Sequence, residues 1–369
     1  MLTGSASHPC LETVRARAYT IPTDKPEADG TMRWASNTLV VVEAAGGGKM
    51  GLGYTYTHSS ITRLIEDKLS EAIVGQDVMN VPAMCAAMQR SVRNMGRDGL
   101  GATAMSAVDA ALWDLKAKLL GLPLATLLGC VRDVVPIYGS GGFTTYSDDD
   151  LHAQFSGWAE RDGCLWVKMK IGSHPEQDPH RVAVARAAIG ERGLFVDSNG
   201  ALTVRKALHV TQMLARDFGV VWHEEPVSSD DLAGLRVVRQ RAPHTTEIAA
   251  GEYGYDLDYF RRMLEAGAVD VQQADATRCG GISGFLQAGV LCEAHHTDLS
   301  AHCAPALHLH VACAVPRFRH LEWFHDHVRI ERMLFDGAPM PRDGVIRPDL
   351  SRPGLGLAFK QSDAEPYRV

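Results

Sequence analysis

The sequence predicts an α/β fold, a (β/α)-barrel preceded by a smaller α+β domain. The first observation is size, because 369 residues, 46% of them hydrophobic, can bury more than one core. The second is a series of eight short apolar runs after residue 129, which recur roughly every 20 to 30 residues with amphipathic stretches between them. The third is a different pattern before residue 129, where strand-like runs come first and helix-like runs follow.

The N-terminal domain is expected to open with a small antiparallel sheet. Residues 11–19 and 38–43 are rich in β-branched and apolar side chains, and the glycine-rich stretch 46–53 is predicted to be a hairpin turn before residues 54–56. From residue 60 to about residue 120 apolar side chains recur at helical spacing, until Gly121 and Pro123 end the pattern. A sheet followed by helices makes this an α+β domain.

The eight later runs are expected to be the strands of the barrel, because strands that alternate with helices form parallel sheets and eight such units close a barrel. They lie near residues 135–140, 165–170, 194–198, 220–224, 247–251, 269–273, 298–301 and 319–323. A stretch rich in proline and glycine, 347–357, is expected to return to the first domain. The sequence therefore predicts an N-terminal domain over residues 1–129, a barrel over 130–345 and a C-terminal segment over 346–369.

Composition excludes several classes of partner. The formal net charge is −7, from 44 acidic and 37 basic residues. The sequence has no strongly basic stretch that could bind the phosphate backbone of a nucleic acid. Residues 1–10 lack the apolar core of a signal peptide, and no segment supplies the roughly 18 uninterrupted apolar residues of a membrane helix. The eight cysteines form no C-x-x-C pair and are interpreted as reduced thiols. We therefore expect a cytoplasmic protein that binds neither nucleic acid nor membrane.

Polar side chains follow the apolar runs where the strands are expected to end. Four successive runs lead into a lysine pair and three acids: Lys168 and Lys170, Asp197, Glu224 and Glu252. Active sites of (β/α)-barrels lie at the carboxyl ends of the strands, so these side chains are expected to share one pocket. Three neighbouring carboxylates repel one another unless a cation lies between them, and their hard oxygens favour Mg²⁺. The three acids are therefore predicted to be Mg²⁺ ligands.

The second half of the barrel adds an acid, a histidine and a further acid. Asp275 follows the sixth run and His302 follows the seventh. A carboxylate on one strand can hold the imidazole of the next strand in one tautomer and raise its basicity. Glu322 ends the eighth run and can donate a proton or hydrogen bond to a substrate carboxylate if burial raises its pKa.

These motifs resemble the mandelate racemase subgroup of the enolase superfamily over nearly the whole chain. The resemblance rests on K-x-K at Lys168, D-x-N at Asp197, E-E-P at Glu224, G-E at Gly251 and the D-x-x-R-x-G-G run from Asp275, with His302 after them in family order. Residues 107–129 resemble the end of that family's capping domain, and 353–357 its C-terminal return. The resemblance implies a modified TIM barrel with an N-terminal capping domain, a small-molecule carboxylate substrate and assembly into homo-oligomers.

The resemblance also implies a role for each residue. Asp197, Glu224 and Glu252 would bind Mg²⁺, while Lys170 on one face of the substrate and His302 with Asp275 on the other would act as bases or acid. Lys168 would help to neutralise the substrate carboxylate and depress the pKa of Lys170, Glu322 would be the electrophilic partner, and Asn199 a further substrate contact. Two departures, His223 before the E-E-P motif and Cys303 after the histidine, are expected to shape the pocket.

Several reactions stay open once the proton α to the carboxylate has been removed. Return of a proton from the opposite face gives a racemase or epimerase, loss of a β-hydroxyl with His302 as acid gives a dehydratase, and rearrangement of a sugar lactone gives a cycloisomerase. The resemblance favours dehydration of an acid sugar, an aldonate or aldarate, to a 2-keto-3-deoxy acid. A non-catalytic barrel is the alternative of another class, but it would need neither Lys170 nor His302. An aldolase or decarboxylase would leave the second base without a role.

Substrate choice is implied to lie in the polar segment 22–34. Its hydrogen-bonding groups suit a polyhydroxylated acid, and a solvated mobile loop is the alternative. The residues concerned are Asp24, Lys25, Glu27, Asp29, Arg33 and Trp34.

Overall fold

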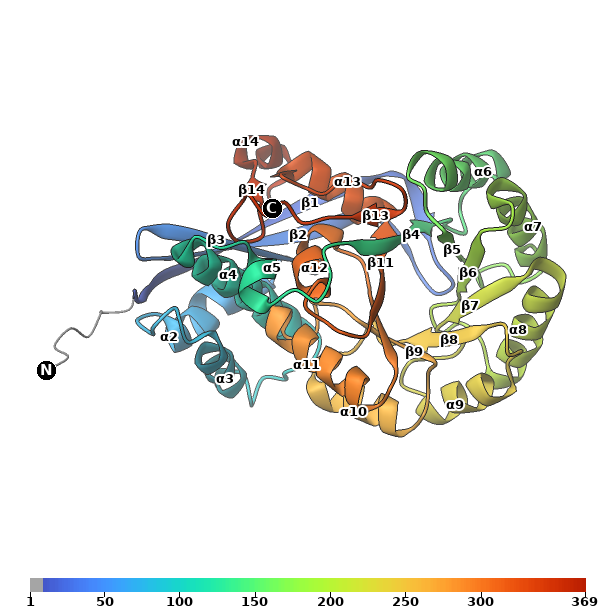
Figure 1. The fold of residues 1–369 in the computed structure, drawn as a ribbon, viewed down its shortest axis with the longest axis horizontal. Coiled ribbons are helices and arrows are strands. Elements are labelled where there is room, and N and C mark those ends of the chain that lie inside the picture. Colours follow the sequence, from blue (N-terminus) through green and yellow to red (C-terminus); the bar gives the residue numbers. More distant parts are fainter. Residues whose placement is uncertain (1–8) are drawn as a thin grey trace, which may run out of the picture.

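The computed structural model describes residues 9–369 of the chain. The prediction for residues 1–10 therefore falls almost entirely outside the described range. Figure 1 shows an N-terminal region in blue and cyan beside a ring of strands and helices coloured from green to orange. The predicted α/β fold, a barrel with an α+β N-terminal domain, is confirmed.

The N-terminal sheet consists of three antiparallel strands, β1 (Leu11–Ala28), β2 (Arg33–Gly46) and β3 (Lys49–Tyr56), in that order. The predicted hairpin between β2 and β3 is confirmed, but its turn is only Gly47–Gly48, both with positive φ, and residues 49–53 belong to β3. The glycines of β3 serve a different purpose. A Cβ at Gly51 would come within 2.1 Å of Ala111 O, so this strand lies against a helix more closely than any larger residue allows.

The helix that β3 packs against is α4 (Leu100–Leu120), which ends at Gly121 in the left-handed conformation, as predicted. Its side chains are buried almost all round because it separates the sheet from the barrel. The other helical elements of this region are α1 (Ile61–Leu64), the π-helix η1 (Ile65–Leu69), α2 (Ser70–Ile73), α3 (Val81–Ser91) and α5 (Leu124–Leu128).

Eight parallel strands form the barrel, and each of the eight predicted runs coincides with one of them. Pairing of β11 with β4 closes the ring, and β13 (Val345–Ile346) adds to β4 from outside. The strands are β4 (Val135–Gly141), β5 (Trp166–Lys170), β6 (Gly193–Asp197), β7 (Val220–Glu224), β8 (Glu247–Ala250), β9 (Val271–Ala274), β10 (Asp298–Ala301) and β11 (Phe318–Phe324).

Helices follow these strands and cover the outside of the ring. Several begin with a side-chain cap, as where Ser147 accepts from Asp150 N and Thr203 from Lys206 N. The elements are α6 (Asp148–Ser156), the π-helix η2 (Gly157–Arg161), α7 (Asp178–Ile189), α8 (Val204–Phe218), α9 (Leu232–Arg241), α10 (Leu257–Glu265), α11 (Gly281–Ala294), α12 (Pro305–Ala312) and α13 (His325–Leu334).

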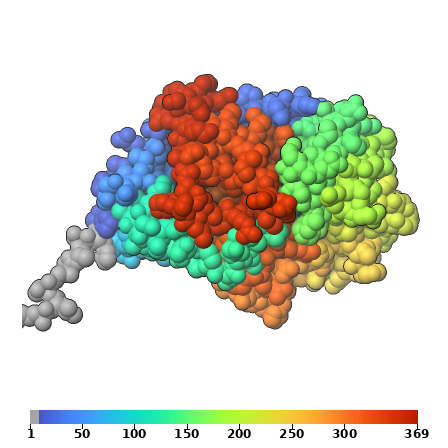
Figure 2. Space-filling view, turned by 45° about the horizontal axis from the view of Figure 1, so that its top comes forward, coloured from blue at the N-terminus to red at the C-terminus, as the bar shows by residue number. Residues whose placement is uncertain are grey.

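The C-terminal segment lies on the surface between the N-terminal region and the first barrel units, in red in Figure 2. It contains β14 (Ala358–Phe359), which pairs with β12 (Phe335–Asp336), then α14 (Gln361–Ala364) and the 3-10 helix η3 (Glu365–Tyr367). Buried Asp114 of α4 accepts from both Leu52 N and Leu355 N, at 2.7 and 2.6 Å, and so joins sheet, helix and tail. Val369 N also donates to Ala18 O.

The hairpin formed by β1 and β2 extends from the N-terminal sheet to the barrel. β1 continues to Ala28 with a bulge between Pro22 and Glu27, and β2 begins at Arg33, so segment 22–34 is the end of a hairpin and not the mobile loop considered above. At its tip a Cβ on Gly30 would meet Ser198 O at 2.5 Å. The hairpin therefore rests on the carboxyl end of β6.

Within residues 9–369 no helix is both long and apolar enough to span a membrane. All eight cysteines are free thiols.

Candidate active site

Lys168 and Lys170 lie two residues apart on β5, so both side chains point into the barrel. Lys168 Nζ lies 2.8 Å from Glu322 Oε1 and also bonds Glu224, while Lys170 Nζ lies 2.5 Å from Asp197 Oδ2. Burial alone would lower the pKa of each amine, but the nearby carboxylates outweigh it and raise both. Lys168 lowers the pKa of Lys170, in the predicted direction, but with no cation beside Asp197 the effect of that carboxylate is larger.

The three predicted metal ligands lie side by side at the mouth of the barrel. Asp197 and Glu224 are register partners on β6 and β7, and Glu252 follows β8 by two residues. All three are buried, and each offers an oxygen within 4.8 Å of the others. Glu252 Oε2 accepts no hydrogen bond from any described residue. A set of buried oxygens with an unused acceptor fits a hard divalent cation.

Burial raises the pKa of each carboxyl here, and the neighbouring charges decide the net direction. Lys170 and Lys168 hold the pKa of Asp197 at about 2, and His302 with Arg278 lowers that of Glu252. For Glu224 burial and the nearby acids prevail over Lys168, and its pKa is raised. The nearby side-chain cations therefore do not stabilise all three acids in their ionised form. A divalent cation would supply the positive charge that is missing.

His302, after β10, forms a pair with Asp275, after β9. His302 Nδ1 lies 2.8 Å from Asp275 Oδ2, so donation along this contact leaves Nε2 free to exchange a proton. Burial would raise the pKa of Asp275, but the bond to His302 lowers it well below its usual range. Nε2 lies 3.4 Å from Glu252 Oε2, at the opposite end of the carboxylate row from Lys170.

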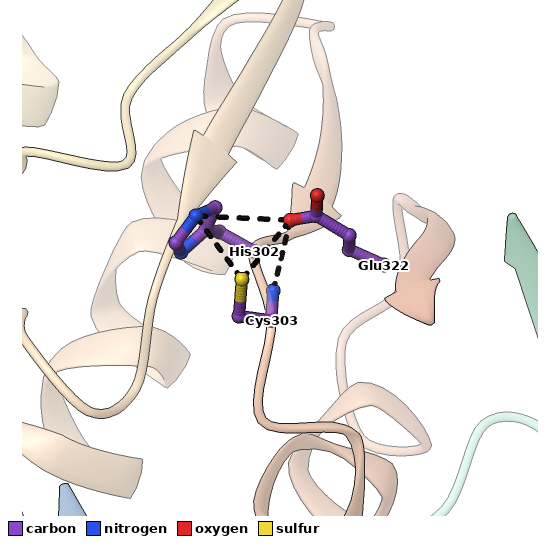
Figure 3. Close-up of side chains that lie close together, drawn as sticks. All are labelled: His302, Cys303 and Glu322. Atoms are coloured by element: carbon purple, nitrogen blue, oxygen red, sulfur yellow. Dashed lines mark hydrogen bonds and ion pairs between the residues drawn. The ribbon is translucent and has the colours of Figure 1, made fainter. Parts of the chain in front are cut away.

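Glu322 lies beside His302 and Cys303, as Figure 3 shows. It accepts hydrogen bonds from Ser140 Oγ at 2.5 Å and Cys303 N at 3.1 Å, and it pairs with Lys168. Burial would raise the pKa of Glu322, but Lys168 and His302 lower it well below its usual range. The shift is opposite in direction to the rise that proton donation by Glu322 would need, and Glu322 holds Lys168 in place.

Asn199 and His223 lie next to the end of β6 but differ in what they can contact. Asn199 has a φ of 44°, its backbone N–H donates to Asp197 Oδ1 at 2.8 Å, and its own buried Oδ1 has no partner among residues 9–369. His223 bonds Ser198 Oγ at 2.8 Å and Thr211 Oγ1 at 2.7 Å, and burial lowers its pKa to about 4. The expectation that His223 shapes the pocket is wrong, because it ties the end of β6 to α8.

The polar residues of segment 22–34 mostly bond to groups of the protein itself. The pairs are Asp24 with His325, Lys25 with Asp150, Glu27 with Trp34 Nε1, and Asp29 with Thr31 and Met32 N, whereas Arg33 is exposed. These contacts anchor the hairpin to α6 and α13. The inference that this segment offers many free groups to a polyhydroxylated acid is therefore not supported.

Sequence reasoning did not single out three further residues at the site. Arg278 donates to Glu252 O at 3.1 Å and lies 3.5 Å from Asp275 Oδ2, so it joins the metal-ligand row to the histidine pair. Ser140 orients Glu322, and Glu225 is a buried acid with a φ of 40° and a pKa raised by burial. Arg278 was already present in the D-x-x-R spacing, and it lies in the turn after β9, where its backbone N–H donates to Asp275 O.

The arrangement can remove a proton from a carbon beside a carboxylate. Two groups able to exchange protons, Lys170 Nζ and His302 Nε2, stand at opposite ends of a row of acids that fits a divalent cation. Lys168 adds a fixed positive charge. The divalent cation and Lys168 would together stabilise the negative charge that develops on a substrate carboxylate in this enclosed site.

Two family models match the chain. One described as "Mandelate racemase / muconate lactonizing enzyme, N-terminal domain" matches residues 14–129, and one described as "Enolase C-terminal domain-like" matches residues 150–364. A solved mandelate racemase/muconate lactonizing enzyme-like protein from Rubrobacter xylanophilus is 52% identical with a TM-score of 0.95, over 98% of this chain and all of that one.

Two relatives have named activities. The 3,6-anhydro-alpha-L-galactonate cycloisomerase of Streptomyces coelicolor is 32% identical over 95% of this chain and 97% of its own length. The L-talarate/galactarate dehydratase of Salmonella typhimurium is 30% identical over 84% of this chain and 77% of its own. A solved mutant of L-talarate/galactarate dehydratase, liganded with Mg and L-glucarate, has a TM-score of 0.91 at 28% identity, over 100% of this chain and 95% of that one.

Proposed function

The chain belongs to the mandelate racemase / muconate lactonizing enzyme family of the enolase superfamily, and from that premise we propose that it dehydrates an acid sugar to a 2-keto-3-deoxy acid. It is an enzyme of the lyase or isomerase class, and its cofactor is Mg²⁺. The observation that carries the proposal is the pair of proton-exchanging groups, Lys170 and His302, at opposite ends of the row formed by Asp197, Glu224 and Glu252.

In the proposed reaction Asp197, Glu224 and Glu252 would hold Mg²⁺, which would supply positive charge where the substrate carboxylate gains its second negative charge. Lys170 Nζ takes the proton from the α-carbon. Lys168, held between Glu224 and Glu322, lies beside the same substrate carboxylate and adds to this stabilisation.

The second half of the proposed reaction uses the histidine pair. His302 gives a proton from Nε2 to the β-hydroxyl, the C–O bond breaks and water leaves with the electron pair. The resulting enol then becomes the 2-keto group. Asp275 holds Nδ1 and stabilises the charged imidazole before that transfer, and Asn199 Oδ1, free of other partners among residues 9–369, is available to a substrate hydroxyl.

The relatives support this reaction class and also a second one. Dehydratases and a cycloisomerase are similar to this chain at about equal identity, 30% and 32%. Both begin with removal of a proton α to a carboxylate, and they differ in which oxygen leaves the β-carbon. Cycloisomerisation of a sugar lactone or anhydro sugar acid is therefore the second candidate, and a racemase or epimerase, in which His302 returns the proton to carbon, is the third.

The test is to incubate the Mg²⁺-loaded protein with a library of aldonic and aldaric acids and their lactones, assaying for 2-keto-3-deoxy product. The same acids are followed in D₂O by proton NMR. We expect keto product from at least one acid. Deuterium at the α-position without keto product would replace the proposal by a racemase or epimerase, and product from a lactone or anhydro acid alone would replace it by a cycloisomerase.

Three further expectations stay predictions. They are the domain limits 1–129, 130–345 and 346–369, the cytoplasmic location, and the assembly into homo-oligomers.

A further inference from the structure

A second group of metal-binding side chains lies beside the carboxylate row, and it consists of His302, Cys303 and Glu322 (Figure 3). All three are buried, and among residues 9–369 this is the only such group that contains a thiol. The carboxylate row offers oxygens alone, whereas this group offers one nitrogen, one sulfur and one oxygen. The group therefore suits a different class of metal ion.

The three ligand atoms lie at the spacing of a tetrahedral metal site. Cys303 Sγ is 3.2 Å from His302 Nε2 and 3.4 Å from Glu322 Oε2, and Nε2 is 3.7 Å from Oε2. The usual lengths of zinc bonds to sulfur, nitrogen and oxygen place ligand atoms about 3.4 to 3.6 Å apart around a tetrahedral Zn²⁺ ion. The group therefore accepts Zn²⁺ with only small movements of its side chains.

The backbone turn after β10 brings the thiol to this place. Neighbouring residues of an extended chain point to opposite sides, so Cys303 would ordinarily face away from His302. Cys303 and Ala304 instead have φ values of 54° and 41°, in the left-handed region that residues other than glycine rarely adopt. Backbone of this kind is concentrated at functional sites. The turn directs the nitrogen and the sulfur into one site.

His302 is already oriented as a metal-bound histidine would be. Its Nδ1 lies 2.8 Å from Asp275 Oδ2, and a carboxylate in this position fixes the tautomer and raises the basicity of the metal-binding nitrogen. Glu252 Oε2 lies 3.4 Å from Nε2 but falls outside the group of three. Three protein ligands with a fourth position for water are typical of zinc sites that exchange their fourth ligand.

Glu322 is held so that one of its oxygens faces the thiol. Ser140 Oγ and Lys168 Nζ contact Oε1 at 2.5 and 2.8 Å, which leaves Oε2 directed at Cys303. Oε2 accepts from Cys303 N at 3.1 Å, and a carboxylate oxygen has a second lone pair that can bind a metal. The oxygen ligand is therefore in place before an ion arrives.

Metal binding at this group would displace one proton. Cys303 Sγ donates to Glu322 Oε2 as a thiol, and burial with the nearby acids raises the pKa of that thiol well above its usual range. A borderline ion such as Zn²⁺ bonds to the thiolate, and the thiol proton leaves to solvent. Mg²⁺ prefers oxygen ligands, so it gains nothing from the sulfur and suits the carboxylate row instead.

We propose that His302, Cys303 and Glu322 form a second metal site, which binds Zn²⁺ or a similar borderline divalent ion, and that an ion bound there inhibits the enzyme. Inhibition follows because the ion takes the lone pair of His302 Nε2, the nitrogen that exchanges a proton in the proposed reaction. The inhibitory role rests on the proposed function, whereas the metal site itself does not.

Co²⁺ is the probe for the site, because it adopts the geometry of zinc sites and its bond to a thiolate gives a charge-transfer band in the near ultraviolet. The reduced full-length protein is held in excess Mg²⁺ and titrated with Co²⁺ under nitrogen. We expect the band to reach its maximum at one Co²⁺ per chain and to disappear when an equivalent of Zn²⁺ is added. A wild-type protein without the band overturns the metal site.

Four variants locate the ion. Cys303→Ala should abolish the band, with Cys303→Ser in its place if the alanine variant does not fold, and Asp275→Asn should weaken Co²⁺ binding by about 10- to 100-fold. Cys130→Ala removes an exposed thiol and should keep the wild-type band. Asp197→Asn removes an acid of the carboxylate row and should keep it too. A band that survives in a folded Cys303 variant, or is lost in a folded Asp197 or Cys130 variant, overturns the assignment.

Steady-state kinetics with whichever acid gives keto product test the inhibitory role. In excess Mg²⁺ we expect Zn²⁺ to inhibit the wild-type enzyme, more Mg²⁺ to bring no relief, and a chelator selective for Zn²⁺ to restore activity. Measured against its own uninhibited rate, Cys303→Ala should need at least about 100-fold more Zn²⁺, since loss of even an outer partner of a metal ligand commonly weakens affinity by about 10- to 100-fold.

Equal sensitivity of the two proteins to Zn²⁺, or relief by Mg²⁺, would overturn the inhibitory role. Absence of turnover with every acid overturns the proposed function and with it the inhibitory role, while the Co²⁺ band decides the metal site by itself.

Discussion

The charged side of the site is built by neighbouring strands in register, whereas the apolar cluster next to Cys303 is built by segments far apart in the chain. The charged side takes Lys168, Lys170, Asp197 and Glu224 from β5, β6 and β7, whose residues pair directly across the sheet. This apolar cluster takes Trp34 from the N-terminal hairpin and Phe143 and Phe324 from opposite ends of the barrel sequence. The difference teaches that strand register brings the charged groups together, whereas the apolar cluster forms only where the hairpin docks on the barrel.

The largest effect is expected from Lys170→Ala. If the charged side carries the chemistry for every substrate, loss of this amine should lower kcat/KM by about 10³-fold or more, because no other described amine except Lys168 reaches the carboxylate row. Steady-state kinetics with whichever acid gives product measures it. Lys206→Ala, on the exposed face of α8, is the control and should keep wild-type kinetics. Undiminished turnover by the Lys170 variant would favour the non-catalytic alternative.

Arg278→Met tests whether the metal-ligand row and the histidine pair are joined. Arg278 contacts both Glu252 and Asp275, so its loss should weaken Mg²⁺ binding and activity by about 10- to 100-fold. Calorimetric titration with Mg²⁺ and kcat at saturating Mg²⁺ separate the two contributions. Arg261→Met, on the surface of α10, removes a similar charge away from the site and should change neither. A fall in Mg²⁺ affinity with full kcat at saturation would limit Arg278 to the metal row.

His223→Gln tests how the stability of the barrel depends on pH. Burial lowers the pKa of His223 from its ordinary 6.5 to about 4, so the unfolded chain binds more protons between these values. Its contribution to stability is complete above pH 6.5 and is lost as the pH falls towards 4. The variant should therefore show a shallower fall of Tm, by a few degrees, over this interval in a thermal melt series. An unchanged slope would assign the acid sensitivity to the other buried histidines.

Glu331→Gln tests the contact between the N-terminal sheet and the barrel, where the sign is opposite. Burial raises the pKa of Glu331 to about 8, although Tyr54 Oη donates to it at 2.6 Å. A raised acid pKa means that the folded protein binds more protons, so stability is lost as the pH rises from about 4.5 through 8. The variant keeps an acceptor for Tyr54 and should flatten this fall of Tm by a few degrees. A fall of the same size in the variant would exclude Glu331 as its source.

The sequence alone was sufficient to predict the barrel strands and to identify the charged side chains at their ends. A strand has a period of two residues, so Lys168 and Lys170 had to share one face, and parallel strands of a barrel bring their carboxyl ends together. The role of Gly51 and Gly53 was not predicted, because their close approach to α4 was hidden within a predicted turn. Arg278 was part of the D-x-x-R-x-G-G motif, but no contact with another residue was predicted for it.

The pKa of Glu322, the place of His223 and the character of segment 22–34 could not be predicted in the same way. Each depends on neighbours that are distant in sequence, such as Lys168 for Glu322 and Thr211 for His223. A sequence pattern reports which side of an element a residue faces, but not which charges it meets there.

By itself the sequence determined the barrel, the order of its strands and the set of acids, lysines and histidine at their ends, because strand periodicity and the parallel arrangement act locally. Only the tertiary structure decided the direction in which each pKa is shifted, where the hairpin rests on the barrel, and which aromatic rings pack beside Cys303. The physical reason is that burial, Coulomb interaction and ring packing depend on distances in space, which the fold sets between residues as far apart as Trp34 and Phe324.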